Sequence, residues 1–175
     1  MEQNSASIWK SSATSGVVLS IVLILIGVGF YVTGNAFAKS AQWITYAVMV
    51  AGVVMAQLSY RKALGGTLTY GQALGMGVLT LFFASIISGI YTYLLYEVID
   101  PSLQEQLRLF SEEQMVKQGQ LSEEQMEAAL KISSRLQSPL MMSVMTVLSY
   151  TFIGLVISLI TSIFVKKKPS EDLVE

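Results

Sequence analysis

Residues 140–165 read LMMSVMTVLSYTFIGLVISLITSIFV, an uninterrupted run without Asp, Glu, Lys or Arg. An α-helix rises about 1.5 Å per residue, so a helix of this length crosses the hydrocarbon core of a bilayer, which is about 30 Å thick. Three further apolar runs precede it in the chain. We therefore predict four membrane spans, at residues 13–34, 43–60, 72–98 and 140–165.

The spans are predicted to be helices although they contain many Val and Ile residues. Lipid offers no partner for backbone N–H and C=O groups, so a spanning segment satisfies them internally. One such helix would also fit the core of a soluble protein, but four of them in 175 residues leave too little polar sequence to cover them. The predicted fold class is all-α: a single membrane domain over residues 1–175, built as an integral membrane four-helix bundle.

The composition excludes several classes of function. The chain has no Cys and no His, which removes the usual ligands of zinc, haem and iron–sulfur clusters and the Ser-His and Cys-His nucleophile pairs. Its net charge is −1 and it carries no basic stripe, so a nucleic-acid partner is not expected. We predict no catalytic residue, no cofactor and no metal site.

One substantial polar segment, residues 100–139, separates the third span from the fourth. It contains seven acidic and four basic residues, a net charge of −3. Asp100 is predicted to be the N-cap of a helix, with Pro101 at the first helical position. An interfacial helix that binds anionic lipid favours Lys and Arg, so the acidic surplus argues against that role. We expect an extramembrane helical hairpin.

The pentapeptide Ser-Glu-Glu-Gln-Met occurs twice in this hairpin, at residues 111–115 and 122–126. Each copy has the capping-box form and is predicted to begin a helix, the second more firmly because Gly119 precedes it. Apolar residues at helical spacing give the hairpin an apolar face, which either docks a partner protein or only packs the hairpin and connects two spans. The candidate residues of a partner surface are Leu103, Leu107, Phe110, Met126 and Leu130.

Small residues spaced four apart recur inside the spans. They let helix backbones approach closely, which is how membrane helices gain contacts. These contacts serve either the bundle itself or a homo-oligomer. The candidate helix-packing residues are Gly71, Gly75, Ser85, Gly89, Gly154, Ser158 and Ser162. Ionisable residues deep in the spans are almost absent, so no proton or sodium relay is predicted.

The positive charges nearest the spans predict the orientation. Arg61 and Lys62 close the second span, and three lysines open the polar tail, residues 166–175. Positive residues in short loops favour the cytoplasmic side, so both termini are predicted to be cytoplasmic, in a bacterial inner membrane. Ala36 and Ala38 also form a small-x-small pattern typical of signal peptidase sites. Cleavage there is an open alternative that would leave three spans.

Residues 65–75, GGTLTYGQALG, and residues 96–101, YEVIDP, carry a resemblance to a known family. Together with the acidic hairpin and Pro139 before the last span, they resemble the domain of unknown function 4199 family, which groups small bacterial integral membrane proteins. The resemblance covers most of the chain. It implies the four-helix architecture and no assigned activity.

We therefore expect a non-enzymatic structural, accessory or interaction protein of the bacterial cell envelope. Its expected partners are the lipid bilayer and a membrane-protein partner or a second copy of the chain. The alternative is a small oligomeric transporter or channel with a pore of Ser, Thr and Tyr side chains. A membrane enzyme would have to use hairpin carboxylates, but adjacent glutamates on a helix diverge by about 100° and form no ready pair.

Overall fold

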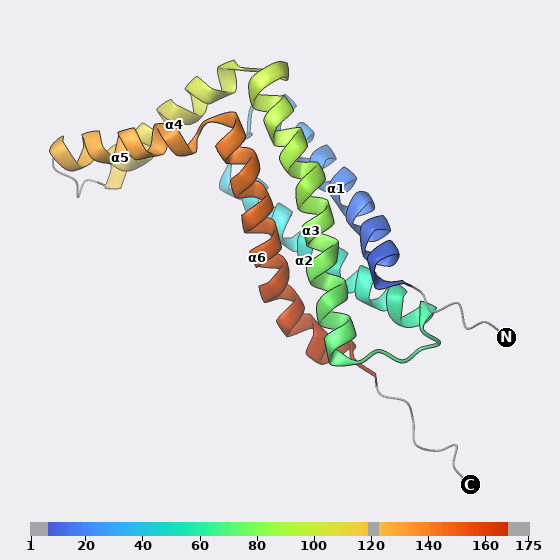
Figure 1. The fold of residues 1–175 in the computed structure, drawn as a ribbon. Coiled ribbons are helices and arrows are strands. Elements are labelled where there is room, and N and C mark those ends of the chain that lie inside the picture. Colours follow the sequence, from blue (N-terminus) through green and yellow to red (C-terminus); the bar gives the residue numbers. More distant parts are fainter. Residues whose placement is uncertain (1–6, 119–122, 168–175) are drawn as a thin grey trace, which may run out of the picture.

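The computed structural model describes residues 7–118 and 123–167, and this part of the chain is all-helical (Figure 1). Six α-helices follow one another in it, and a π-helical turn, η1, extends the third. Their bounds are α1 Ile8–Val32, α2 Lys39–Ala63, α3 Tyr70–Leu94, η1 Leu95–Ile99, α4 Ser102–Gln118, α5 Glu123–Leu136 and α6 Pro139–Val165. No strand occurs in the described ranges beyond a single antiparallel bridge between Leu68 and Lys167.

Four of these elements have the length and hydropathy of membrane spans: α1, α2, α3 with η1, and α6. The predicted all-α class with four long apolar helices is therefore confirmed. Helices α1 and α2 begin before the predicted residues 13 and 43, and the fourth helix begins at Pro139, whose missing N–H costs nothing at a helix start.

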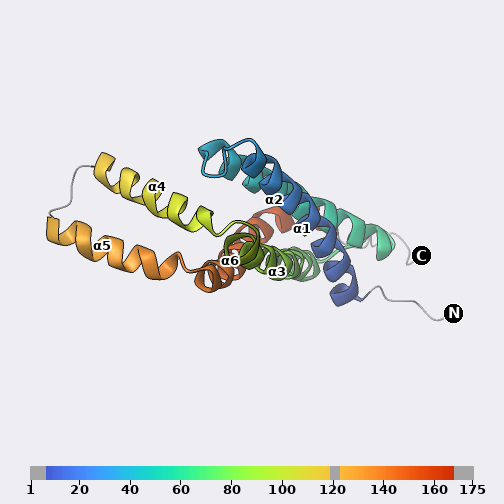
Figure 2. The ribbon, with the colours of Figure 1, turned by 90° about the horizontal axis from the view of Figure 1, so that it is seen from above.

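Helix α3 is the centre of the bundle. It lies beside α6 along its length and also contacts α1 and α2 (Figures 1 and 2). Its side chains Ala73, Leu81 and Ala84 are fully buried. Leu81 and Ala84 belong to a cluster with residues of α1 and α2, which shows that three helices share this part of the core.

The turn between α2 and α3 is built by two glycines and a capping box. Gly65 and Gly66 adopt φ values of 76° and 95°, a region that side chains rarely enter, and their N–H groups bond to the last carbonyls of α2. Thr69 then caps α3: its hydroxyl oxygen accepts the N–H of Gln72 at 3.3 Å, and its own N–H bonds to Gln72 Oε1 at 3.0 Å.

This turn lies at the same end of the bundle as both ends of the described chain. Leu68 and Val165 share one buried cluster, against which Ile8 of α1 packs. Leu68 and Lys167 also exchange two backbone hydrogen bonds of 2.8 Å. The first of the four long helices therefore begins, and the last one ends, at the same end of the bundle.

Helices α4 and α5 leave the opposite end of the bundle sideways and run antiparallel to each other (Figure 2). We call these two helices the arm. Helix α4 continues through Ser111 without a break, so the prediction that the first Ser-Glu-Glu-Gln-Met copy begins a helix is wrong. Nothing before Ser111 stops the helix, and its hydroxyl instead accepts the Nε2 amide of Gln137 at 2.8 Å. The cap predicted in the second copy, residue 122, lies outside the described residues.

Candidate functional site: an aromatic crevice beneath helix α4

A crevice of about 600 Å³ lies at the end of the bundle from which the arm departs. We call it the aromatic crevice, because almost half of the chain's aromatic residues line it. They are Phe30, Tyr31, Phe37, Tyr46, Tyr91, Tyr96, Phe110 and Tyr150. Its volume is that of pockets which hold small molecules, and a mostly apolar wall with a few polar groups is typical of them.

Five segments of the chain build the walls of the crevice: α1, the start of α2 with the preceding turn, α3 with η1, α6 and α4. Helix α4 closes it through Leu103, Phe110 and Gln114, whose spacing of seven and eleven residues puts them on one side of the helix. Phe37 in the α1–α2 turn stacks on Phe110, with ring centroids 5.4 Å apart and ring planes 22° apart. This contact joins α4 to the bundle beside the crevice.

The stripe of Leu103, Leu107 and Phe110 therefore faces inward. Leu103 is only 2% exposed, so its prediction as part of a partner surface is wrong. Phe110 is half-buried in its stack with Phe37, and Leu107 between them is also half-buried. The helical spacing of the stripe is as predicted, but the stripe faces the crevice, and Phe37 of the α1–α2 turn covers it at Phe110.

The root of α4 is fixed by polar contacts that cross between elements. Asp100 Oδ2 accepts the Tyr31 hydroxyl at 3.0 Å, and Asp100 Oδ1 accepts the N–H of Ser102 at 3.1 Å and its hydroxyl at 2.5 Å. These hydrogen bonds, the one from the Ser102 hydroxyl most of all, hold the pKa of Asp100 below its ordinary value. Gln104 Nε2 also donates to the backbone carbonyl of Tyr96 at 3.0 Å.

The π-helical turn η1 lies directly beside the crevice and has no counterpart in the sequence predictions. The Asp100 N–H bonds to the carbonyl of Leu95, five residues back, at 2.8 Å. The extra residue in this turn widens the helix, and Leu95 and Tyr96 within it line the crevice. Single π-helical turns occur frequently at functional sites, which adds weight to this end of the bundle.

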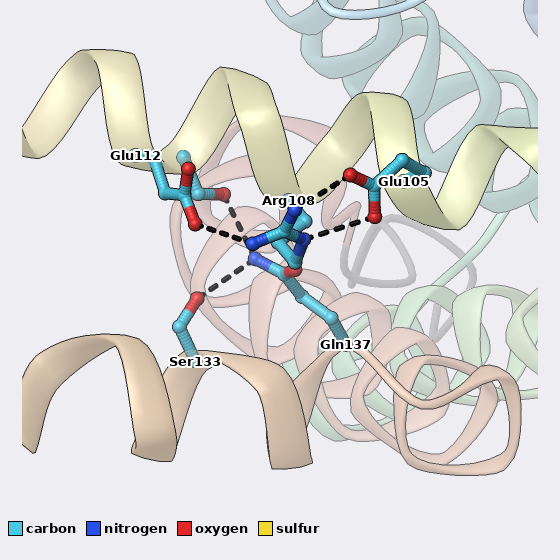
Figure 3. Close-up of polar contacts among 6 residues, drawn as sticks. Glu105, Arg108, Glu112, Ser133 and Gln137 are labelled. Atoms are coloured by element: carbon cyan, nitrogen blue, oxygen red, sulfur yellow. Dashed lines mark hydrogen bonds and ion pairs between the residues drawn. The ribbon is translucent and has the colours of Figure 1, made fainter. Parts of the chain in front are cut away.

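An ion-pair cluster forms around Arg108 within α4, and the side chain of Gln137 joins α5 to α4 (Figure 3). The Arg108 guanidinium donates to both oxygens of Glu105, at 2.6 and 2.9 Å, and to Glu112 Oε1 at 2.6 Å. The hydrogen bonds from Arg108 lower the pKa of Glu105. Gln137 Nε2 donates to Ser133 Oγ at 2.7 Å as well as to Ser111, so it ties the end of α5 to α4.

Most of the predicted small residues of α3 and α6 lie where these helices meet. Ser143 Oγ donates to the carbonyl of Gly89 at 2.8 Å, and a Cβ added to Gly154 would lie 2.8 Å from the Cβ of Leu81. Ser158, Ser162 and Ser85 are fully buried. These contacts are within the bundle.

Two glycines of α3 lie at its edge, and two further glycines, Gly16 and Gly77, lie where helices meet. The space around Gly71 is open to 4 Å, so Gly71 makes no packing contact within the bundle, and Gly75 meets only Ile8, at 3.3 Å. Gly16 of α1 lies close to α3, and Gly77 of α3 lies close to Ser158 of α6 and Val53 of α2. Small-residue spacing alone does not tell which side of a helix meets a neighbour.

A buried glutamine joins three helices in the half of the bundle that lies away from the arm. The sequence places Gln57 near a span end, yet its side chain is fully buried. Its Nε2 donates to the carbonyl of Ala73 on α3 at 3.0 Å and to Ser162 Oγ on α6 at 3.3 Å. Gln57 therefore acts as a polar link inside the bundle, of the kind that orders membrane helices.

The fold and these contacts define the class of protein: an all-helical chain whose described part includes four helices long and apolar enough to cross a membrane. The family model described as "Protein of unknown function (DUF4199)" matches residues 14–167. The chain belongs to this family, which confirms the resemblance seen in residues 65–75 and 96–101. No curated protein and no solved structure matches the chain.

Proposed function

We propose that this chain is a non-enzymatic integral membrane protein of the bacterial inner membrane, an accessory or interaction subunit that contacts a protein partner through its arm. The observation that carries the proposal is the size of the arm. Helices α3 and α6 already lie side by side near the arm, where Ser143 bonds to Gly89. Neighbouring antiparallel helices are ordinarily joined by two to eight residues, whereas here residues 100–138 stand between them. Connection alone does not account for a segment of this length.

The outward side of the arm offers the contact surface. Apolar side chains stand exposed on both helices: Leu109 and Val116 on α4, and Ile132 and Leu136 on α5. The two helices of the arm also carry more acidic than basic residues. A protein with apolar and basic side chains would complement this surface better than an anionic membrane surface would.

The proposed topology puts both termini in the cytoplasm and the arm outside the bilayer on the opposite side. The return of Ile8 and Val165 to one end of the bundle supports an even number of crossings. Arg61 and Lys62 lie in the last turn of α2 at that end, and Arg61 Nη1 donates to the carbonyl of Val165 at 3.1 Å. Positive residues close to span ends favour the cytoplasmic side.

Transport is less well supported by the polar groups of the spans. Thr80, Thr92 and Thr151 each donate to the carbonyl four residues earlier in their own helix, at 2.7 to 2.9 Å. The protons of these three hydroxyls are therefore not available to a solute. A purified chain that moves solutes across liposomes would nevertheless overturn the proposal.

Photo-crosslinking in living cells tests the proposed role of the arm. A crosslinking amino acid at Ile132, which is 61% exposed on α5, is expected to give one discrete adduct with another envelope protein. The matched control is Phe164, 80% exposed near the far end of α6, which is expected to contact lipid and give none. Absence of an adduct at Ile132 and at Leu109 would refute the proposal. An adduct of twice the chain's mass would identify the partner as a second copy.

A further inference from the structure

The charge on the wall of the aromatic crevice has one sign. Lys39 is the single charged residue that lines the crevice, and no ion pair of Lys39 occurs within residues 7–118 and 123–167. Lys39 is also the first residue of α2, a helix whose start has no side-chain cap, so the positive end of the helix dipole adds to the charge of the lysine. The crevice is thus suited to a negatively charged group at this point.

Hydroxyl groups around the crevice provide further donors. In the described part of the chain, the hydroxyls of Tyr91 and Tyr150 have no hydrogen-bond partner. Tyr46 accepts the Nε2 amide of Gln42 at 3.0 Å, which leaves the proton of its own hydroxyl free to donate. These phenols combine apolar rings with polar tips, an arrangement that suits the boundary between acyl chains and headgroups.

The remaining wall is apolar and needs an apolar occupant. Ile26, Leu95 and Leu103 lie between the rings, together with alanines of the α1–α2 turn and α2. A small inorganic anion would leave this surface unfilled, and a zwitterionic lipid would bring a cationic group close to Lys39 together with its phosphate. A molecule with an acyl chain and an anionic head satisfies both parts. In a membrane, the abundant molecule of this kind is an anionic phospholipid.

We propose that the aromatic crevice binds one anionic phospholipid, with an acyl chain among the aromatic rings and the phosphate beside Lys39. The phosphate accepts hydrogen bonds from Lys39 and the phenol of Tyr46, and the chain lies against Phe30, Phe37 and Phe110. The site is independent of the proposed partner of the arm, since its ligand comes from the surrounding bilayer.

Native mass spectrometry of the full-length chain, delipidated and then titrated with phosphatidylglycerol or phosphatidylcholine, tests the proposal. One phosphatidylglycerol per chain is expected to remain bound at lipid concentrations at which phosphatidylcholine does not. The Lys39→Gln variant is expected to weaken phosphatidylglycerol binding about fivefold, because one basic residue near a membrane surface contributes about 1 kcal/mol. The matched control is Lys10→Gln, which removes an exposed lysine from the first turn of α1 at the other end of the bundle.

A second variant separates occupancy of the crevice from adhesion to its rim. Ala41→Phe adds a ring to the wall of the crevice and is expected to abolish retention of the lipid. If a thermal denaturation assay shows that this variant is not folded, the comparison of Lys39→Gln with Lys10→Gln alone tests the proposal. Equal retention of both lipids by the unaltered chain, equal effects of the two lysine variants, or full retention by folded Ala41→Phe would overturn the proposal.

Discussion

Replacing Gly16 by alanine tests the close approach of α1 to the backbone of α3. A Cβ added to Gly16 would lie 2.8 Å from the carbonyl oxygen of Thr80, 3.1 Å from the amide nitrogen of Ala84 and 2.7 Å from the Cβ of Phe83. The first two are backbone atoms of α3, and the third is fixed to that backbone. None of them can rotate away, so α1 and α3 have to separate.

The expected loss of stability follows from two opposing effects. Overpacking in a well-packed interior costs about 1–3 kcal/mol. Replacing a glycine in a helix by alanine returns up to about 1 kcal/mol through helix propensity. Because the obstructing atoms are rigid, the cost lies in the upper part of its range. We expect Gly16→Ala to lower the free energy of unfolding by about 1–2 kcal/mol.

The assay is reversible unfolding of the purified chain in mixed detergent micelles with increasing SDS. In a Trp43→Phe background, which removes the second tryptophan, Trp9 fluorescence reports on the contact between α1 and α3, because the Trp9 ring lies 6.4 Å from the Phe83 ring. Gly29→Ala is the matched control in the same helix, since nothing lies within 4 Å of its added Cβ. We expect this control to match or slightly exceed the unaltered chain. Equal stability of Gly16→Ala and Gly29→Ala would refute the packing of α1 on α3.

Three further predictions concern polar contacts. Gln57→Met removes the hydrogen bonds to the carbonyl of Ala73 and to Ser162. The same unfolding assay is expected to show a loss of about 1 kcal/mol, because hydrogen bonds inside membranes average about 0.6 kcal/mol each. A loss above about 2 kcal/mol would contradict this. Tyr31→Phe is expected to raise the pKa of Asp100 toward its ordinary 3.8 in an NMR titration of the carboxyl carbon. Since the folded pKa of Asp100 is depressed, the stabilisation from Asp100 is present above pH 3.8 and is lost as pH falls through the folded pKa. An Asp100 pKa that is equal in the variant and the unaltered chain would count against the hydrogen bond from Tyr31. Arg108→Ala removes exposed ion pairs and is expected to change the thermal midpoint of the arm, followed by circular dichroism, by little in low salt and not at all in high salt.

The four apolar helices could be predicted from the sequence because they depend on composition along one continuous segment. The helix starts could not, since a capping motif begins a helix only where the chain before it is not helical. Thr69 to Gln72 has this motif and follows Gly65 and Gly66, whose left-handed backbone ends α2. The motif at Ser111 follows a helix that has no reason to stop, so it lies in the middle of α4.

The crevice could not be predicted because it depends on which segments meet. The apolar stripe of α4 is visible in the sequence, but its cover, Phe37, lies in a turn more than sixty residues earlier. The small residues of α3 present the same problem. Gly71 and Gly77 are separated by about 240° around a helix, and only the second faces a neighbour. Spacing in the sequence shows which residues share a face of a helix, but only the tertiary contacts show which face meets a neighbouring helix.

Helix α4 has three sides with different surroundings, which explains why the arm is fixed where it leaves the bundle and exposed along its outer side. The face with Leu103 and Phe110 closes the crevice, and the face with Ser111 holds α5 through Gln137. The third face carries Leu109 and remains exposed. Contacts with the bundle and with α5 therefore fix α4 on two sides, while its third side stays open to a partner of the arm.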